Sequence, residues 1–233
     1  MNSLRKVLAV MIVSLPSQLV AGEIIQVNRR DFRGCLHDIV DFQKTAAKPF
    51  PGTSYTARIP YSGLTVHNRF LGQIPVLRLE GNRTFGVNYG APSNPLKVGQ
   101  TRSGKSTLQT ILTDDGSGDV ILTSRVFEPT IQTRDRAVGF GTIVVKFVNR
   151  QFVFGFDLEP LDDKERADPV AVVSFFGEDG ALIGTPMRLT RFGRFTFATK
   201  DLERKVKGIE FINTGGAPIG IDDIVFELPL HLG

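Results

Sequence analysis

The stretch Arg150–Pro160, RQFVFGFDLEP, decides the fold of this chain. Successive side chains of an extended strand point to opposite faces, so residues two apart share a face. One face would carry the large apolar residues Phe152, Phe154, Phe156 and Leu158. The other would carry Val153, Gly155 and Asp157. This two-residue period predicts a β-strand with one buried face.

The same alternation recurs along the chain, in GRFTFAT (193–199), KGIEFINT (207–214) and IDDIVFEL (221–228). In PVAVVSFFGEDGALIG (169–184), Asp179-Gly180 predicts the tip of a hairpin. About ten short strands at a spacing of roughly 10–20 residues are typical of a sandwich or barrel. Apolar faces on many strands need a second sheet to cover them. We therefore predict an all-β fold, an antiparallel two-sheet β-sandwich of jelly-roll-like form.

The first 22 residues read as a secretory signal peptide. Arg5 and Lys6 precede an apolar run from Val7 to Leu15, and Val20-Ala21-Gly22 fits a small-residue cleavage site. We expect residues 23–233 to form a single β-sandwich domain that is secreted or periplasmic. No later run is apolar enough for a membrane span, so we expect the mature protein to be released without a transmembrane anchor.

The charge balance argues against a nucleic-acid partner. Removal of Arg5 and Lys6 with the signal peptide leaves 26 Lys and Arg against 24 Asp and Glu. Nucleic-acid-binding proteins usually cluster their basic residues on one face or segment. Here bases alternate with acids, as in DDKERAD (162–168), which is typical of a solvated loop.

The segment GQTRSGKS contains the full P-loop pattern, with Gly99, Gly104, Lys105 and Ser106 at its fixed positions. A P-loop requires a helix directly after the lysine, because the helix N-terminus holds the phosphates. The next residues, TLQTILTDDGSGD (107–119), are rich in Thr and Ile and end in a turn sequence, so they predict a strand. We therefore interpret the pattern as a chance match and expect no nucleotide.

The remaining motifs do not define a catalytic site. Cys35 is the only cysteine in the sequence. We expect it to act as a small apolar residue at the start of a strand. Asp222 and Asp223 are adjacent within an expected strand, where one should point inward and need a partner. An arginine, a backbone amide or calcium could supply it, so calcium is the one cofactor that the sequence suggests.

Several segments resemble, in order, the secreted β-sandwich domains of bacterial PEP-CTERM (exosortase-sorted) proteins. The resemblance rests on HDIVDFQ (37–43), PGTSYTARIPYSGLTVHN (51–68), FVFGFDLEP (152–160), AVVSFFGEDGALIGT (171–185) and KGIEFINTGGAPIGIDDIVFEL (207–228). It implies a jelly-roll-like fold but little about activity. Such proteins often end in Pro-Glu-Pro, a membrane span and an arginine cluster, whereas this sequence ends in FELPLHLG.

Two classes of function therefore stay open, with a third behind them. The first is a non-catalytic binding module, with polysaccharide as the leading ligand and Tyr55, Tyr61 and Tyr89 as the first candidates for sugar contact. The second is a structural or adhesive component of the cell surface or matrix, stabilised by calcium. The third is a glycan-acting hydrolase, which would pair Asp222 or Asp223 with Glu159 or Glu178.

Overall fold

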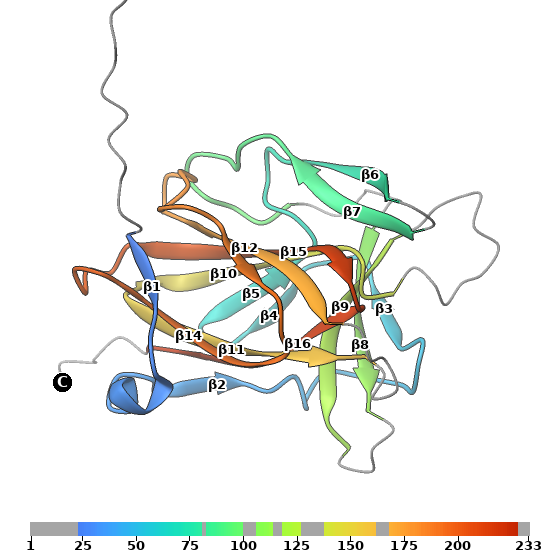
Figure 1. The fold of residues 1–233 in the computed structure, drawn as a ribbon, viewed down its shortest axis with the longest axis horizontal. Coiled ribbons are helices and arrows are strands. Elements are labelled where there is room, and N and C mark those ends of the chain that lie inside the picture. The colour runs from blue at the N-terminus through green and yellow to red at the C-terminus, as the bar shows by residue number, and fades with distance from the viewer. Residues whose placement is uncertain are drawn as a thin grey trace, which may run out of the picture.

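The computed structural model describes residues 23–80, 83–99, 106–113, 118–126, 138–161 and 168–227. These residues form antiparallel sheets A and B, which pack in a sandwich-like arrangement, as the alternation predicted (Figure 1). They contain sixteen strands, more than the alternation alone revealed, because several are only three residues long. The only helix among them is the 3-10 turn η1, Arg29–Phe32.

Sheet A contains eight strands, seven of them in one hydrogen-bonded path and β2 paired to β16 beside it. In spatial order the path is β1 (Ile24–Gln26), β14 (Gly193–Thr199), β11 (Val153–Pro160), β16 (Ile219–Phe226), β9 (Val120–Val126), β8 (Ser106–Leu112) and β3 (Thr53–Tyr55). Strand β2 spans Asp38–Val40.

Sheet B contains six strands, and a separate two-stranded hairpin follows β5 in the chain. The order in sheet B is β13 (Met187–Leu189), β12 (Pro169–Phe176), β15 (Val206–Gly216), β10 (Thr142–Gln151), β5 (Leu64–His67) and β4 (Ile59–Tyr61). The hairpin consists of β6 (Ile74–Glu80) and β7 (Arg83–Tyr89), and it lies across sheet B on the side away from sheet A (Figure 1).

From β10 to β16 the chain alternates between the sheets. Strands β10, β12 and β15 lie in sheet B, while β11, β14 and β16 lie in sheet A. The one local hairpin in this region joins β12 to β13 through Glu178-Asp179-Gly180, where Gly180 has a φ of +79°. A positive φ suits glycine, so the predicted Asp-Gly turn is confirmed.

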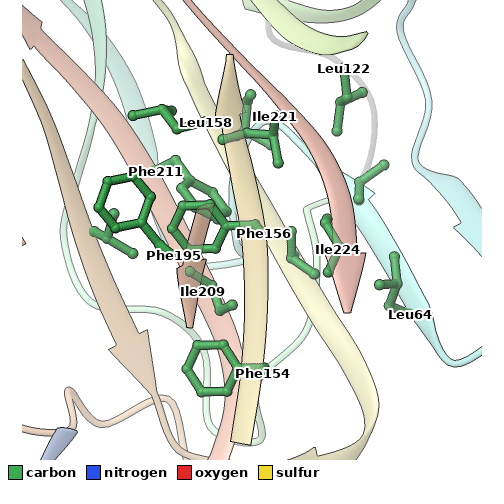
Figure 2. Packing of buried hydrophobic residues seen from close by; sticks show 14 of the residues in the cluster. Leu64, Leu122, Phe154, Phe156, Leu158, Phe195, Ile209, Phe211, Ile221 and Ile224 are labelled. Atoms are coloured by element: carbon green, nitrogen blue, oxygen red, sulfur yellow. The ribbon is translucent and has the colours of Figure 1, made fainter. Parts of the chain in front are cut away.

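The core between the sheets packs nine phenylalanines among aliphatic residues (Figure 2). Phe154 and Phe156 of β11 point inward, as the alternation predicted, and so do Phe195 and Phe197 of β14. The ring of Phe156 meets that of Phe211 from sheet B edge-on, with 4.7 Å between centroids. Phe152 was assigned to the same face, but it lies at the corner between β10 and β11, half-buried, with its ring 6.4 Å from that of Phe32.

The residues after Lys105 form strand β8, so the P-loop pattern is not followed by a helix. Gly104 and Lys105 lie outside the described residues, whereas Gly99 is buried against Arg69 and His67. The prediction of a strand is confirmed because Thr107–Leu112 pairs along its whole length with β9. Of the turn expected at residues 114–118, residues 114–117 lie outside the described residues, and Gly118 has a φ of +77°.

Two further features complete the fold. Cys35 lies in a turn three residues before β2, half-buried and with a free thiol, and not at the start of a strand as predicted. No helix in the described part of the chain is long and apolar enough to cross a membrane. The expected signal peptide, residues 1–22, lies outside the described residues.

Candidate functional site

The three tyrosines predicted to contact sugar are divided between two places. Tyr55 on β3 and Tyr61 on β4 are half-buried and pack against the main core. The Tyr55 hydroxyl donates to the carbonyl of Ala46, and the Tyr61 hydroxyl lies 2.6 Å from Thr45 Oγ1. Burial raises the pKa of Tyr61 to about 12. The structure therefore brings Tyr55 and Tyr61 together, while Tyr89 is 66% exposed on the separate hairpin.

A β-bulge in β16 determines where Asp222 and Asp223 lie. Between the pairs Asp157↔Asp222 and Gly155↔Val225, β16 has one more residue than β11. Such an extra residue bends the strand and shifts its alternation by one position. Asp223 has a φ of +44°, a left-handed conformation that Asp tolerates better than most residues.

The bulge keeps both carboxyl groups out of the core. Ile221 before it and Ile224 after it both point into the core, although they are three residues apart. Asp222 and Asp223 are both half-buried. The expectation that one of them points inward assumed a regular strand, and it is wrong because the strand is bulged.

Asp157 is the buried anion of the same face. Only 5% of the residue is exposed. Its Oδ1 accepts a hydrogen bond from Arg29 at 2.7 Å, and its Oδ2 accepts one from Arg194 Nε at 2.8 Å. Arg29 comes from η1 and also donates to Thr196 Oγ1. The N-terminal segment is thereby joined to β11 and β14 through one carboxylate.

Further carboxylates surround this ion pair on the outer face of sheet A. Glu159 lies two residues after Asp157 on the same face of β11. Its pKa is raised by burial and by the charge of Asp157. Burial raises the pKa of Asp222 to about 7, and the charges of Asp223, Asp119 and Asp157 act in the same direction. Burial and then Asp157 also raise the pKa of Asp223.

We call this group the acidic face; it consists of Asp157, Glu159, Asp222 and Asp223, with Arg29 and Arg194. The structure thus brings Glu159 to the predicted aspartate pair. Glu178 lies elsewhere, in the β12–β13 turn of sheet B, where its carboxylate is 3.5 Å from Arg150 and 3.9 Å from Lys207. Among the described residues, no three His, Cys, Asp or Glu side chains are grouped closely enough to hold a metal ion.

Hydrogen bonding distinguishes the members of the acidic face. Both oxygens of Asp157 are occupied by arginine. Asp222 Oδ1 accepts the backbone N–H of Asp223 at 2.8 Å. Within the described residues, the carboxylates of Glu159 and Asp223 accept no hydrogen bond. A half-buried carboxylate without a donor has lost part of its hydration without compensation, so it can gain from a ligand that donates hydrogen bonds.

Comparisons with known proteins do not assign this site. No family model, curated protein or solved structure matches the chain. The resemblance to PEP-CTERM proteins therefore stays a prediction, and function has to be argued from the chemistry of the site.

Sequence reasoning found Asp222 and Asp223 but did not connect them to Asp157, Arg29 or Arg194. The period of RQFVFGFDLEP already placed Asp157 opposite the phenylalanines, and Glu159 shares its parity. The two arginines carry no such signal. Arg29 lies 128 positions from Asp157 in the sequence and reaches it only through the folded arrangement of sheet A.

Proposed function

We propose that this protein is an exported, non-catalytic binding module that holds a polysaccharide on the acidic face of sheet A. The observation that carries the proposal is the pair Glu159 and Asp223. Both carboxylates are half-buried, both have raised pKa values, and neither accepts a hydrogen bond from the described residues. Hydroxyl groups of a sugar would donate to these oxygens and replace the lost hydration.

The negative charge of the acidic face restricts which polysaccharides can bind. Four carboxylates stand against two arginines, and both arginines are bound to Asp157. Asp119 and Asp41 add to the negative field. Like charges facing each other across an interface are unfavourable, so uronic acid polymers, sulfated glycans and nucleic acids fit poorly. Neutral glycans and glycans with free amino groups fit well.

Export is part of the proposal and rests on the sequence of residues 1–22. Its basic start, apolar stretch and small-residue end are those of a secretory signal. Polysaccharide is abundant outside the cytosol, which agrees with a sugar ligand. Detection of the mature protein outside the cytosol, beginning near Glu23, would test this part.

A glycan array with the purified protein tests the ligand. We expect binding to neutral or amino-bearing glycans that is lost, or weakened at least about tenfold, in the variants Asp223→Asn and Glu159→Gln. An interaction of about 1.4 kcal/mol corresponds to that factor. Glu203→Gln is the matched control. Glu203 is exposed and follows the C-terminal end of β14, whereas Arg194 lies at the start of that strand. Absence of binding to every glycan contradicts the proposal.

Tyr89→Ala separates the acidic face from the tyrosines predicted from sequence. Tyr89 is the one of the three whose ring is largely exposed. If sugar binding is lost in Tyr89→Ala and retained in Asp223→Asn, the ligand binds at the hairpin and the acidic face is not the site.

The calcium-stabilised structural protein is the second candidate. The described carboxylates alone are not grouped closely enough to hold a metal ion, so calcium would need further oxygens from water or a partner. Calcium binds carboxylate oxygens and would relieve their mutual repulsion. Thermal unfolding with calcium and with chelator distinguishes the two. A higher midpoint with calcium that disappears in Asp223→Asn, without glycan binding, would favour the structural role. Release of sugar from the bound glycan would instead indicate the hydrolase.

A further inference from the structure

A second buried carboxyl group lies on the opposite side of the molecule, beneath the β6–β7 hairpin. Glu210 of β15 is only 4% exposed. It faces away from the core, because its neighbours Ile209 and Phe211 point inward. In the sheet register it lies beside Val144 of β10 and Ser174 of β12. The side chain therefore lies between sheet B and the hairpin.

Two amides connect Glu210 to the hairpin. Asn88 on β7 donates to Glu210 Oε1 at 2.9 Å, and Gln73, just before β6, donates to the same oxygen at 3.1 Å. Asn88 also donates to the backbone carbonyl of Asn68 at 3.1 Å. Glu210 therefore contacts both ends of the segment that forms the hairpin.

Burial without a cation favours the neutral form of Glu210. Both amides donate to Oε1, which favours the ionised form, and within the described residues Oε2 has no donor. Among the residues that the structure describes, no lysine, arginine or histidine forms an ion pair with Glu210. A carboxylate buried without a cation is unfavourable, so burial raises the pKa of Glu210 to about 7 despite the two amides.

The charged groups on the surrounding elements are directed elsewhere. From the β5–β6 connection, Arg69 donates to the carbonyl of Gln73. His67 of β5 is separated from Glu210 by Val144, and burial lowers its pKa, which favours the neutral imidazole. On β10 the next charge is Lys146, whose partner Gly208 is covered by Phe70 and Leu96. On β7, Arg83 donates to Gly216.

The rest of the contact between hairpin and sandwich is made mainly by β7, whose residues 84–86 are buried. Gly86 of β7 exchanges two hydrogen bonds with the sandwich, one from its N–H to Phe140 and one from Thr142 to its carbonyl, each 2.8 Å. Phe85 packs with Phe140 and Val126 in a cluster separate from the main core. Arg83 adds a hydrogen bond to the Gly216 carbonyl and lies over the Phe140 ring, 5.4 Å from its centroid. Among these described contacts, Glu210 is the carboxyl group whose ionisation can change how firmly the hairpin is held.

We propose that Glu210 is a proton-controlled latch, which holds the β6–β7 hairpin against sheet B when its carboxyl group is protonated and loosens it when the group ionises. The opened hairpin exposes Glu210 to water, where its pKa returns to the ordinary value of 4.5. Because the closed state has the higher pKa, closure is strongest below pH 4.5 and weakens as the pH rises to about 7. Above that pH both states are ionised and no further change follows. The inference is independent of the acidic face.

Hydrogen exchange of backbone amides tests the latch. After correction for the intrinsic rates, we expect the amides of β7 to open at least about tenfold more often at pH 7.5 than at pH 4.5. Amides of β11 serve as the internal reference. In Glu210→Gln this pH dependence should be absent, because glutamine keeps the acceptor and does not ionise. Asp222→Asn is the control, because it removes an acid from sheet A whose pKa is raised to a similar value. The opening of β7 should keep its pH dependence in this variant.

A measurement on the unaltered protein covers the case in which Glu210→Gln does not fold. Carbon NMR of the glutamate carboxyl groups, with the Glu159 signal identified by its absence in Glu159→Gln, should show Glu210 titrating well above pH 5.5. If no glutamate other than Glu159 titrates above that pH, the latch is wrong. Equal opening of β7 at both pH values, or the same pH dependence in a folded Glu210→Gln variant, also overturns the proposal.

Discussion

At the scale of single residues, Asp157 is the side chain that joins η1 to the neighbouring strands β11 and β14 of sheet A. It is buried, and it is bound by one arginine from η1 and another from β14. The two guanidinium groups differ in environment. The Arg29 side chain is 22% exposed, whereas that of Arg194 is 71% exposed. The Asp157–Arg29 ion pair should therefore contribute more to the free energy of unfolding than the Asp157–Arg194 pair, because exposed ion pairs contribute little.

Asp157→Ala should reduce the free energy of unfolding by about 3 kcal/mol, since it leaves Arg29 half-buried without a counter-charge. Urea unfolding measures this. Arg194→Ala should have a smaller effect than Arg29→Ala. Asp201→Ala, which removes an exposed carboxylate paired with Lys205, is the control and should leave the unfolding midpoint unchanged. An equal response to Asp157→Ala and Asp201→Ala would contradict the structural role of Asp157.

At the scale of elements, the bulge in β16 and the hairpin β6–β7 are the two departures from a regular sandwich that position the proposed sites; β15 also shifts register against β10 and β12. The bulge keeps Asp222 and Asp223 on the outer side of sheet A. Its conformation is restrictive, because a φ of +44° is unfavourable for side chains branched at Cβ.

Asp223→Gly should fold with unchanged or slightly greater stability, because glycine adopts a positive φ without steric conflict. Asp223→Val should lose about 1–2 kcal/mol, because valine in the left-handed region clashes with the backbone. Thermal unfolding of the two variants gives the comparison. If both melt at the same temperature, Asp223 does not adopt this conformation.

Asp223→Gly also removes the carboxylate from a correctly folded face, so it should no longer bind glycan.

The same elements show how far sequence reasoning reaches. Strand β11 could be predicted because its period is local and its phenylalanines are unmistakable. The bulge could not, because it depends on how β16 pairs with β11 across a long separation in sequence. Glu210 alternates with Ile209 and Phe211, which correctly places it outside the core. Its burial depends on the hairpin, which no local pattern places above β15.

At the scale of the whole molecule, the carboxyl groups set the dependence of stability on pH. Both Glu210 and Asp222 have a pKa of about 7, above the ordinary values of 4.5 and 3.8. A raised pKa in the folded state means that folding favours the protonated form. These groups therefore stabilise the fold fully below about pH 4, and this contribution is lost as the pH rises to about 7.

The protein should consequently be less stable at pH 8 than at pH 5, by about 1–3 kcal/mol, with the lowered pKa of buried His67 opposing part of this loss. Most of the difference should come from Glu210, because Asp222 is half-exposed and screened by solvent. Unfolding in urea at the two pH values measures it. The double variant Glu210→Gln, Asp222→Asn should reduce the difference. An increase in stability from pH 5 to pH 8 would mean that neither carboxyl group is desolvated as described.

The alternation of successive strands between the two sheets has a consequence for how the chain reaches this structure. Most neighbours in each sheet come from distant parts of the sequence, although β4–β5, β8–β9 and β12–β13 pair locally, and β16 joins β11 to β9 in the middle of sheet A. Contacts between distant segments slow folding, because long loops must close before they form. A nascent polypeptide ending before Ile219 would lack the strand that unites the halves of sheet A. Sheet A should therefore stay incomplete until β16 has been synthesised.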